Sequence, residues 1–344
     1  MENSHTLWIV VSTAVAVFSA FIMGLFTRNQ MPVDGKTVLL TGASEGMGLA
    51  VAKQLAAKGA NLILVARSVG KLEEALLALK AVAKNPKTQR FHYISADVSV
   101  PNHAGPLIAE AIAWNSGRAP DIVWCIAGMC APGLFVETPF SNLREHMDLN
   151  FYGMAEMSHV ILREWLAPDS PIEEQPKHLV LTSSVVAFYT VAGYGGYAPA
   201  KSAVRALADT ISQEVMLYPQ KVAVHVVYPG TIDSPGLERE NKLKPEITLL
   251  LEKDDPVQSA EEVASRAIAG LERGDFFITV SWLGHLMKWG VMGGSLRNSW
   301  VIDTFMMIVT AFAWIIAQPV ILGTVRKFAR ENGHPSTYKK KTGA

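Results

Sequence analysis

The chain has 344 residues, of which 49% are hydrophobic, so it has ample material for one large domain or two modest ones. Its 31 basic and 31 acidic residues cancel, which argues against a nucleic-acid partner and against attraction of the whole molecule to an anionic bilayer. The two cysteines, Cys125 and Cys130, and the scattered histidines match no metal-ligand spacing. We therefore expect reduced thiols, a cytosol-facing domain and no bound metal.

The first predicted element is an apolar helix near the N-terminus. Residues 7–26 contain no charge, and at about 1.5 Å per residue this helix spans about 30 Å, the thickness of a bilayer's hydrocarbon core. Glu2 stands where a signal peptide has a basic region, so we expect an uncleaved membrane anchor over residues 1–34. Arg28 and Lys36 follow the segment, and the positive-inside rule then predicts that the main domain faces the cytosol.

From residue 35 to residue 282 the chain alternates short apolar runs with amphipathic stretches, and no long linker divides it. The runs are rich in β-branched residues and leucine, as buried parallel strands are. Their alternation with helices predicts one α/β domain, a doubly wound Rossmann-type sheet with helices on both faces. The seven predicted strands are Thr37–Thr41, Asn61–Ala66, Phe91–Ser95, Ile122–Ile126, His178–Thr182, Val222–Val227 and Phe276–Val280.

A glycine-rich string, TGASEGMG over residues 41–48, joins the first predicted strand to a predicted helix over residues 49–57. A strand, a glycine turn and a helix N-terminus present unpaired backbone N–H groups and the positive end of a helix dipole to a pyrophosphate. Glycine permits the turn, the close approach of a phosphate and the packing of the helix on the sheet. We therefore expect a dinucleotide site, with contacts from Gly42, Ser44, Glu45, Gly46 and Gly48.

The ends of the second and third predicted strands indicate which dinucleotide binds. Arg67 follows the second strand, at the position where a carboxylate would hold the ribose hydroxyls of NAD. A guanidinium binds a 2′-phosphate in bidentate fashion, so we expect NADPH, with Ser44 as a second phosphate contact. An ordinary surface arginine at a strand end is the alternative. Asp97 and Val98, after the third strand, are placed to contact the adenine ring.

A Tyr-x-x-x-Lys pair follows the fifth predicted strand. Tyr197 and Lys201 are four residues apart, which places both side chains on one face of a helix. A phenol with a pKa of about 10 is a poor acid at neutral pH, and an adjacent ammonium lowers that pKa by stabilising the phenolate. Such a pair also occurs on exposed helix surfaces, so the prediction of proton transfer depends on its partners.

Two polar residues supply those partners. Ser184 closes the fifth predicted strand, and Asn150 follows a helix-like stretch. With them, the chain resembles the short-chain dehydrogenase/reductase family over roughly residues 35–280. The resemblance implies that Tyr197 donates a proton and that Ser184 hydrogen-bonds the substrate's carbonyl oxygen. It also implies that Lys201 lowers the tyrosine pKa and binds the cofactor ribose, and that Asn150 holds a relay water.

The end of the fourth predicted strand departs from the family pattern. Ala127 and Gly128 match the family's Asn-Asn-Ala-Gly motif, but Cys125 and Ile126 stand where the two asparagines would be. This departure puts the hydrogen bonds that stabilise the strand in doubt, while leaving the predicted chemistry unchanged.

We expect a membrane-associated extension over residues 283–330. Residues 304–325 are uncharged and a basic cluster follows them, so the run is predicted to enter a membrane. One crossing would place the basic tail in the lumen, whereas a re-entrant hairpin kinked near Pro319, or a shallow helix, would keep it cytosolic. A buried core helix or an oligomer-interface helix is the alternative. The tail, residues 331–344, is predicted to be disordered, and its lysine pair resembles, at an unusual spacing, a retrieval signal of the endoplasmic reticulum.

Residues 234–256 stand where the fold places a substrate lid. The apolar centre of this segment, residues 247–251, is predicted either to line a groove for a lipid chain or to pack on the core or the bilayer.

Within the family, the layout resembles the membrane-bound reductases of sphingolipid synthesis, especially fungal ones. The likeness rests on the N-terminal anchor, the glycine string, the strand end LVAR, the string YPGTIDSPG at residues 228–236 and the hydrophobic extension. It implies NADPH-dependent reduction of the C3 ketone of membrane-embedded 3-ketodihydrosphingosine to dihydrosphingosine at the endoplasmic reticulum. By the same resemblance the protein is expected to form a homo-oligomer. Another lipid reductase, for a steroid, retinoid or fatty-acyl substrate, is the alternative. A non-catalytic NADP-binding scaffold would have no reason to keep the four catalytic residues.

Overall fold

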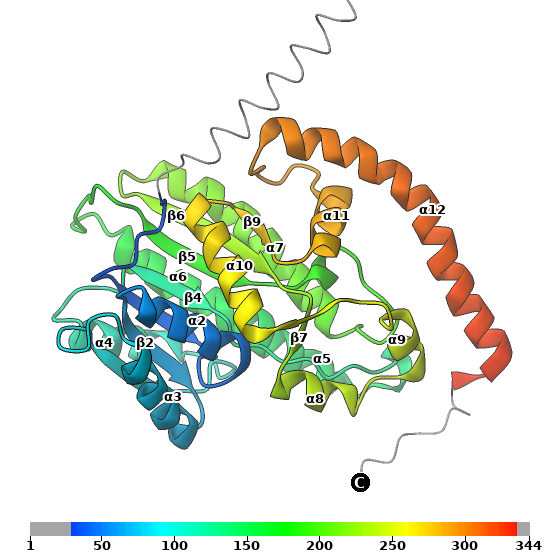
Figure 1. Ribbon diagram of the computed structural model, residues 1–344, viewed down its shortest axis with the longest axis horizontal. Coiled ribbons are helices and arrows are strands. Elements are labelled where there is room, and N and C mark those ends of the chain that lie inside the picture. The colour runs from blue at the N-terminus through cyan, green and yellow to red at the C-terminus, as the bar shows by residue number, and fades with distance from the viewer. Residues whose placement is uncertain (1–28, 336–344) are drawn as a thin grey trace, which may run out of the picture.

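The structure, a computed structural model, describes residues 29–335. The predicted anchor helix and the end of the tail lie outside the described residues. Seven parallel strands form the central sheet in the spatial order β3-β2-β1-β4-β5-β6-β9, with helices on both faces (Figure 1). The predicted doubly wound α/β fold is therefore confirmed. The strands are β1 (Thr37–Thr41), β2 (Asn61–Ala66), β3 (Phe91–Ser95), β4 (Ile122–Cys125), β5 (Lys177–Thr182), β6 (Val222–Tyr228) and β9 (Phe277–Thr279).

The strands coincide with the predicted apolar runs because helices cover both faces of the sheet, so apolar side chains are needed on both. In β1, Val38 and Leu40 belong to one core cluster, and Leu39 between them belongs to the other. The principal helices are α2 (Gly46–Ala57), α3 (Val69–Val82), α4 (Ala104–Trp114), α5 (Phe140–Met147), α6 (Gly153–Trp165), α7 (Tyr197–Glu214) and α10 (Ala260–Arg273).

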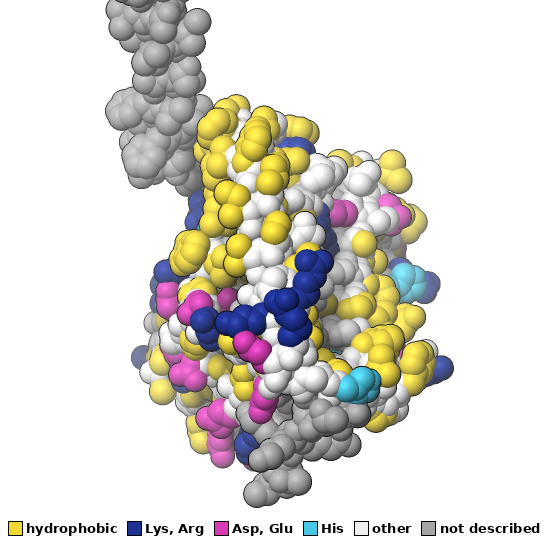
Figure 2. All heavy atoms as spheres, turned by 90° about the vertical axis from the view of Figure 1, so that its right-hand side faces the viewer, with side chains coloured by type: hydrophobic (Ala, Val, Ile, Leu, Met, Phe, Trp, Pro, Cys, Tyr) yellow, Lys and Arg dark blue, Asp and Glu magenta, His cyan; other side chains and the backbone are white. Residues whose placement is uncertain are grey.

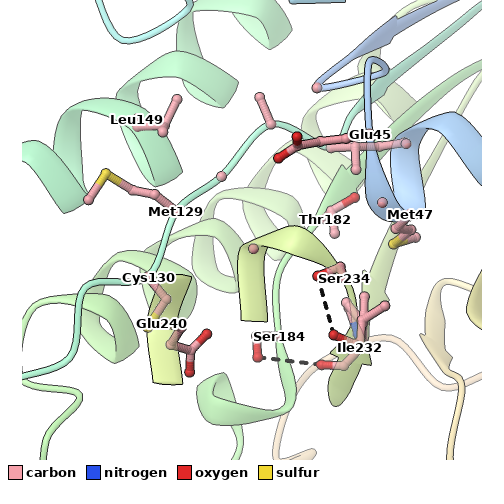
Figure 3. A pocket seen from close by; sticks show the side chains of 18 of the residues that line it. Glu45, Met47, Met129, Cys130, Leu149, Thr182, Ser184, Ile232, Ser234 and Glu240 are labelled. Carbon is pink, nitrogen blue, oxygen red and sulfur yellow. Dashed lines mark hydrogen bonds between the residues drawn. The ribbon is translucent and has the colours of Figure 1, made fainter. Parts of the chain in front are cut away.

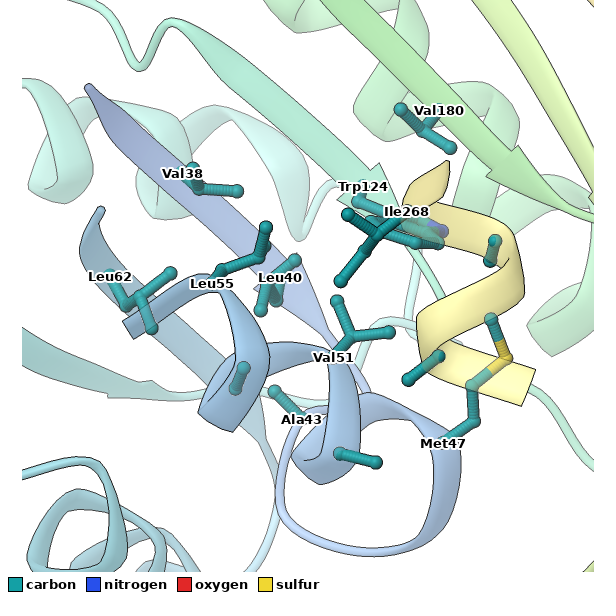
Figure 4. Close-up of a cluster of buried hydrophobic side chains, with 14 of the residues drawn as sticks. Val38, Leu40, Ala43, Met47, Val51, Leu55, Leu62, Trp124, Val180 and Ile268 are labelled. Carbon is teal, nitrogen blue, oxygen red and sulfur yellow. The ribbon is translucent and has the colours of Figure 1, made fainter. Parts of the chain in front are cut away.

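Each face of the sheet has its own hydrophobic core. On one face, Val51 and Leu55 of α2 and Ile268 of α10 pack around Leu40 and Trp124 of the sheet (Figure 4). On the other face, helices α4, α6 and α7 cover the alternate strand residues. Close packing on both faces holds the carboxyl ends of the strands in fixed positions, and those ends carry the polar residues of the predicted site.

Two short strands that the sequence did not predict flank the lid. Strand β7 (Thr231–Asp233) pairs in parallel with β8 (Val257–Ser259), and between them lie α8 (Pro235–Asn241) and α9 (Glu246–Leu251).

The apolar centre of the lid packs on the core. Ile247 and Thr248 of α9 are buried, and the Thr248 hydroxyl donates a hydrogen bond of 2.7 Å to the carbonyl oxygen of Ala192. None of residues 247–251 lines either cavity, so the predicted chain-lining role is not observed; Thr248 packs instead against Ala192 and Gly193.

The C-terminal extension consists of α11 (Trp282–Val291) and α12 (Trp300–Asn332). Of the alternatives left open for this run, the re-entrant hairpin is wrong, because α12 runs unbroken through Pro319. A proline removes one backbone hydrogen bond, and without loop-forming residues beside it the chain continues as a helix. Residues 331 and 332, predicted as disordered, form the last helical positions.

Helix α12 crosses the outside of the molecule beside α11 and α9 (Figure 1). Its most apolar window has a mean hydropathy of 2.1 and is only 6% buried, so the helix is long and apolar enough to enter a membrane. This is a weak sign of membrane association. Hydrophobic side chains follow its outer face, and Lys and Arg side chains gather toward its lower end (Figure 2).

Candidate active site

A cavity of about 910 Å³ lies at the carboxyl ends of the strands, where the strand order reverses between β1 and β4. Doubly wound folds bind their ligands in this crevice. The structure brings all but one of the predicted site residues to the cavity wall. Those that line it are Gly42, Ser44, Glu45, Gly46, Gly48, Arg67, Asp97, Val98, Ser184, Tyr197 and Lys201. Figure 3 shows part of this wall, with Glu45 and Ser184 labelled.

The glycine loop forms one side of the cavity. Gly42 has a φ of +68°, and a Cβ at this position would lie 2.7 Å from the backbone of Ala127. A Cβ on Gly48 would lie 2.1 Å from the Gly42 carbonyl oxygen, so glycine is needed for α2 to begin this close to the loop. The side chain of Glu45, the N-cap residue, caps no N–H group of α2. The first turn of α2 therefore offers uncapped N–H groups at the cavity wall, which fits a pyrophosphate.

Basic side chains gather at the end of the cavity formed by β2 and β3. The Arg67 side chain is 75% exposed, and its Nη1 atom lies 3.6 Å from Oδ2 of Asp97. Burial raises the pKa of the Asp97 carboxyl, but hydrogen bonds from Ser99 and the charge of Arg67 outweigh it and hold the pKa below its usual value. Two further cations, Lys71 of α3 and Arg239 of α8, line the same cavity and were not predicted.

Glu45 joins the lid to the glycine loop. Its carboxylate accepts hydrogen bonds of 2.5 Å from Nζ of Lys71 and from Nη2 of Arg239. The Lys71 hydrogen bond is the main reason that the pKa of Glu45 is lowered, and Arg239 adds to the effect against a smaller opposing effect of burial. Glu45 therefore holds two cations at the cavity wall.

Tyr197 and Ser184 form the opposite end of the cavity. Tyr197 begins α7, and Ser184 follows β5. Ser183 donates its hydroxyl hydrogen to the Lys201 carbonyl oxygen at 2.8 Å. Ser184 donates only a long hydrogen bond of 3.4 Å to the Pro229 carbonyl oxygen, so its hydroxyl can donate to a closer acceptor. Burial raises the pKa of the Tyr197 phenol, and the Ser184 hydroxyl opposes this rise. The phenol is thus protonated at neutral pH and can act as a proton donor.

Lys201 is buried on the same helix face. Its Nζ donates a hydrogen bond of 3.0 Å to the Thr182 carbonyl oxygen and lies 5.7 Å from the centre of the Tyr197 ring. Burial lowers the pKa of Lys201 to about 8. The expected lowering of the Tyr197 pKa by Lys201 is not observed, because burial of the phenol dominates and the ammonium is directed to a backbone carbonyl.

Asn150 lies behind the cavity wall, in a π-helical turn (Asp148–Tyr152) between α5 and α6. Its amide donates to and accepts from the backbone of Met129, both at 3.0 Å. A Cβ on Gly128 would lie 2.8 Å from Oδ1 of Asn150 and 3.3 Å from Nζ of Lys201. Asn150 therefore positions the segment that faces Lys201, and its role as holder of a relay water stays a prediction.

Thr41 supports the end of β4, where the family asparagines are missing. Its hydroxyl oxygen accepts hydrogen bonds from the backbone N–H groups of Ile126, at 3.1 Å, and Ala127, at 3.3 Å. A side chain of β1 thus holds this segment on one side, while Asn150 holds it on the other.

Two aromatic neighbours of Tyr197 were not predicted. The ring centres of His146 and Tyr194 lie 6.2 Å and 5.9 Å from that of Tyr197. His146 is fixed by its own hydrogen bonds, accepting from the Ala131 N–H at 3.0 Å and donating to the Asn142 carbonyl oxygen at 2.7 Å. Both rings restrict the orientation of Tyr197. Neither follows a sequence pattern that marks such a role.

A second hollow, of about 490 Å³, adjoins the main cavity. The two share Val186 and Tyr194 as wall residues, so they meet beside the catalytic end. Most of its other wall residues are apolar or glycine: Leu134, Phe135, Val191, Ala192, Gly193, Gly195, Ala198 and Pro199.

Comparison with known proteins gives a consistent picture. The family model described as short chain dehydrogenase matches residues 36–244. The 3-ketodihydrosphingosine reductase gsl-3 of Neurospora crassa is 55% identical over 348 residues, covering 99% of this chain and 96% of the relative. The 3-ketodihydrosphingosine reductase ksrA of Aspergillus fumigatus is 44% identical, covering 94% of this chain and 93% of the relative.

Solved structures share the fold. Levodione reductase superposes with a TM-score of 0.62 at 22% identity, covering 72% of this chain and 97% of that one. A short-chain type dehydrogenase/reductase from Mycobacterium ulcerans gives a TM-score of 0.61 at 24% identity, covering 72% and 89%.

Proposed function

The chain belongs to the short-chain dehydrogenase/reductase family, and we propose that it catalyses NADPH-dependent reduction of the C3 ketone of 3-ketodihydrosphingosine to dihydrosphingosine. The observation that carries the proposal is one cavity that joins an uncapped helix N-terminus to Ser184 and Tyr197. The relatives that match nearly the whole chain are named for this reaction.

A nicotinamide cofactor would supply the hydride that the carbonyl carbon accepts. As negative charge develops on the carbonyl oxygen, the Ser184 hydroxyl donates a hydrogen bond to it and the Tyr197 phenol transfers its proton to it. Lys201 lies on the same helix face, with its Nζ 5.7 Å from the centre of the Tyr197 ring, and would bind the ribose of the cofactor. The product is the secondary alcohol.

The cofactor is proposed to be NADPH because cations surround the end of the cavity where a 2′-phosphate would lie. Arg67 lies in the β2–α3 connection, Lys71 lies in the first turn of α3, and Arg239 lines the same cavity from the lid. Guanidinium groups bind phosphate oxygens through parallel hydrogen bonds. Ser44 also lines the cavity and would be a further phosphate contact.

The substrate is proposed to be a lipid because the second hollow provides an apolar wall beside Tyr194, whose ring centre lies 5.9 Å from that of Tyr197. Ligand pockets of this kind are lined mainly by apolar side chains, with a few polar groups that orient the reacting end. A ketone placed at Ser184 and Tyr197 would leave its hydrocarbon chain free to enter this hollow.

The protein is proposed to lie at the endoplasmic reticulum membrane with its catalytic domain in the cytosol. Helix α12 packs against α11 and α9, so its axis follows the body of the protein. A helix held in this way can lie along the membrane surface with its apolar face in the lipid, which suits the predicted shallow helix. The charges that flank the predicted N-terminal anchor support the cytosolic orientation.

The proposal is tested with the purified full-length chain in detergent, by following NADPH oxidation and the lipid product. We expect turnover of 3-ketodihydrosphingosine at least tenfold faster than that of steroid, retinoid or fatty-acyl ketones in the same micelles. Faster turnover of one of these competitors would replace the proposed substrate.

A further inference from the structure

The lid brings two carboxylates to the catalytic end of the cavity. Glu240 lies near the end of α8 and Glu252 follows α9, and both line the cavity wall. The Tyr194 hydroxyl hydrogen-bonds to both, at 2.8 Å from Oε1 of Glu240. The ring of Tyr194 is in turn 5.9 Å from that of Tyr197. These contacts place the two carboxylates close to the proposed proton donor.

Lys244 forms ion pairs with both carboxylates. Its Nζ lies 3.0 Å from Oε1 of Glu240 and 2.7 Å from Oε2 of Glu252. The Lys244 side chain is 4% exposed, and this residue does not belong to the cavity wall. Among the described residues, it is the cation within ion-pair distance of either carboxylate. One ammonium is therefore shared by two carboxylates, so Glu240, Glu252 and Lys244 together carry one excess negative charge.

The excess charge is directed into the catalytic cavity. In Figure 3 the Glu240 carboxylate lies beside Cys130 and extends toward the space in front of Ser184. Burial is the main cause that raises the pKa of Tyr197, and the charge of Glu240 is among the smaller ones. Burial and the charge of Glu252 also raise the pKa of Asp255, another cavity residue, to about 6. The catalytic end of the cavity is thus a place where a cation is favoured.

We propose that Glu240, with Glu252 beside it, binds an ammonium group carried by the substrate on the carbon next to its carbonyl. The inference rests on the proposed function and names the polar group that this site selects. The two carboxylates share the single Lys244 ammonium, so one negative charge has no cation of its own, and a substrate ammonium would compensate it on binding. A ketone that lacks the amine would leave this charge uncompensated, and the enzyme would discriminate against it.

The arrangement also orients the substrate. With the carbonyl oxygen held by Ser184 and Tyr197, the ammonium would point to the lid and the hydrocarbon chain to the second hollow. Glu240 would then act at the step of substrate binding and leave cofactor binding unchanged, because the cations Arg67 and Lys71 lie at the other end of the cavity.

The test compares two ketones with the full-length chain in detergent: 3-ketodihydrosphingosine and its deamino analogue, in which hydrogen replaces the amino group. The variants are Glu240→Gln, Glu252→Gln and, as a matched control, Glu238→Gln. Glu238 is exposed on the same helix and does not line the cavity. NADPH affinity, from fluorescence titration, and the melting temperature report whether each variant keeps its fold.

We expect the wild-type chain to prefer the amino ketone at least tenfold in kcat/KM. Glu240→Gln should reduce kcat/KM for the amino ketone by about 10- to 100-fold, the loss of a charge-assisted hydrogen bond, while the deamino ketone and NADPH affinity keep their wild-type values. Glu252→Gln should give a smaller loss for the amino ketone, and Glu238→Gln none.

The assignment of Glu240 would be overturned if Glu240→Gln lowered kcat/KM equally for both ketones, or if the wild-type chain had the same kcat/KM for both. Either result would leave the proposed function intact. If the wild-type chain turns over neither ketone, the proposed function itself fails.

Discussion

Burial sets the acid–base properties of the two central side chains. It keeps the Tyr197 phenol protonated and lowers the pKa of Lys201 to about 8, so at neutral pH the site holds a neutral phenol beside an ammonium. This is the protonation state that ketone reduction requires of its donor, since the proton must be present when the carbonyl oxygen gains charge.

Replacement of Tyr197 by Phe removes the proton donor and keeps the ring that packs against Tyr194 and His146. We expect kcat to fall by about 10²- to 10⁴-fold with little change in NADPH affinity, because general acid catalysis contributes on this order. Tyr152→Phe, at an exposed position, serves as the control. Full turnover of Tyr197→Phe in steady-state assays would show that another group donates the proton.

The pKa of Lys201 predicts a pH dependence. Its ammonium form predominates below pH of about 8 and is lost as the pH rises through that value, whereas Tyr197 stays protonated. If the ammonium supports the reaction, kcat/KM for ketone reduction falls on the alkaline side with an apparent pKa of about 8. Lys201→Arg keeps its charge and should lack this inflection even if its activity is low. An unchanged profile in that variant would assign the inflection to another group.

Arg67→Ala tests the proposed selection of NADPH. Losing a guanidinium–phosphate contact should weaken NADPH binding by about 10- to 100-fold and leave NADH binding near its original value. Fluorescence titration with both cofactors measures the two affinities, and Arg118→Ala is a surface control away from the cavity wall. Equal losses for the two cofactors would contradict the 2′-phosphate assignment.

At the scale of elements, the C-terminal extension is fastened to the reductase fold by polar contacts. The buried Asp303 of α12 accepts hydrogen bonds from Lys288, at 3.2 Å, and from Trp289, at 2.7 Å, both on α11. The Asn298 side chain pairs with the backbone of Phe277 on β9, which covers the open edge of the sheet. Arg205 of α7 donates to carbonyl oxygens at the end of α11. The catalytic helix and the extension are therefore one packed unit.

Asp303→Ala would leave the Lys288 ammonium buried without its partner. We expect a loss of about 3–5 kcal/mol in the free energy of unfolding, which is measured by urea denaturation in detergent. Asp254→Ala, at an exposed position of the lid, is the matched control and should change stability little. A wild-type midpoint for Asp303→Ala would show that α12 is held by apolar packing alone.

At the scale of the whole molecule, α12 presents an apolar face beside the region that contains the lid. Phe312 and Ile316 are exposed on it, and basic residues follow in its last turns. On a membrane this face would bring the lid close to the lipid in which the proposed substrate resides.

Phe312→Glu combined with Ile316→Glu should weaken this membrane contact. We expect lower turnover of substrate presented in vesicles and unchanged turnover of substrate presented in detergent, because the catalytic cavity is untouched. Leu217→Glu, an exposed position outside α12, controls for surface charge. Equal turnover of vesicle substrate by the double variant and by the wild type would exclude α12 as a membrane contact.

Local patterns predicted much of the fold and the candidate site. Strands buried on both faces must be apolar throughout, so the apolar runs of the sequence predicted β1 and β2 with their correct bounds. The sequence predicted the roles of Gly42 and Gly48, because a side chain at either position would collide with nearby backbone atoms. The course of α12 through Pro319 was not predicted, because composition does not distinguish a continuous helix from a hairpin.

The sequence by itself determined the doubly wound sheet, the glycine loop and the Tyr197–Lys201 pair, since each depends on residues close together in the chain. Only the tertiary structure decided which charges meet in the cavity. Glu240 and Glu252 reach Tyr194 from 46 and 58 residues away, and Asn150 reaches Met129 from 21 residues away. Such pairings depend on how the lid and helices fold back over the sheet, and no local periodicity encodes that distance.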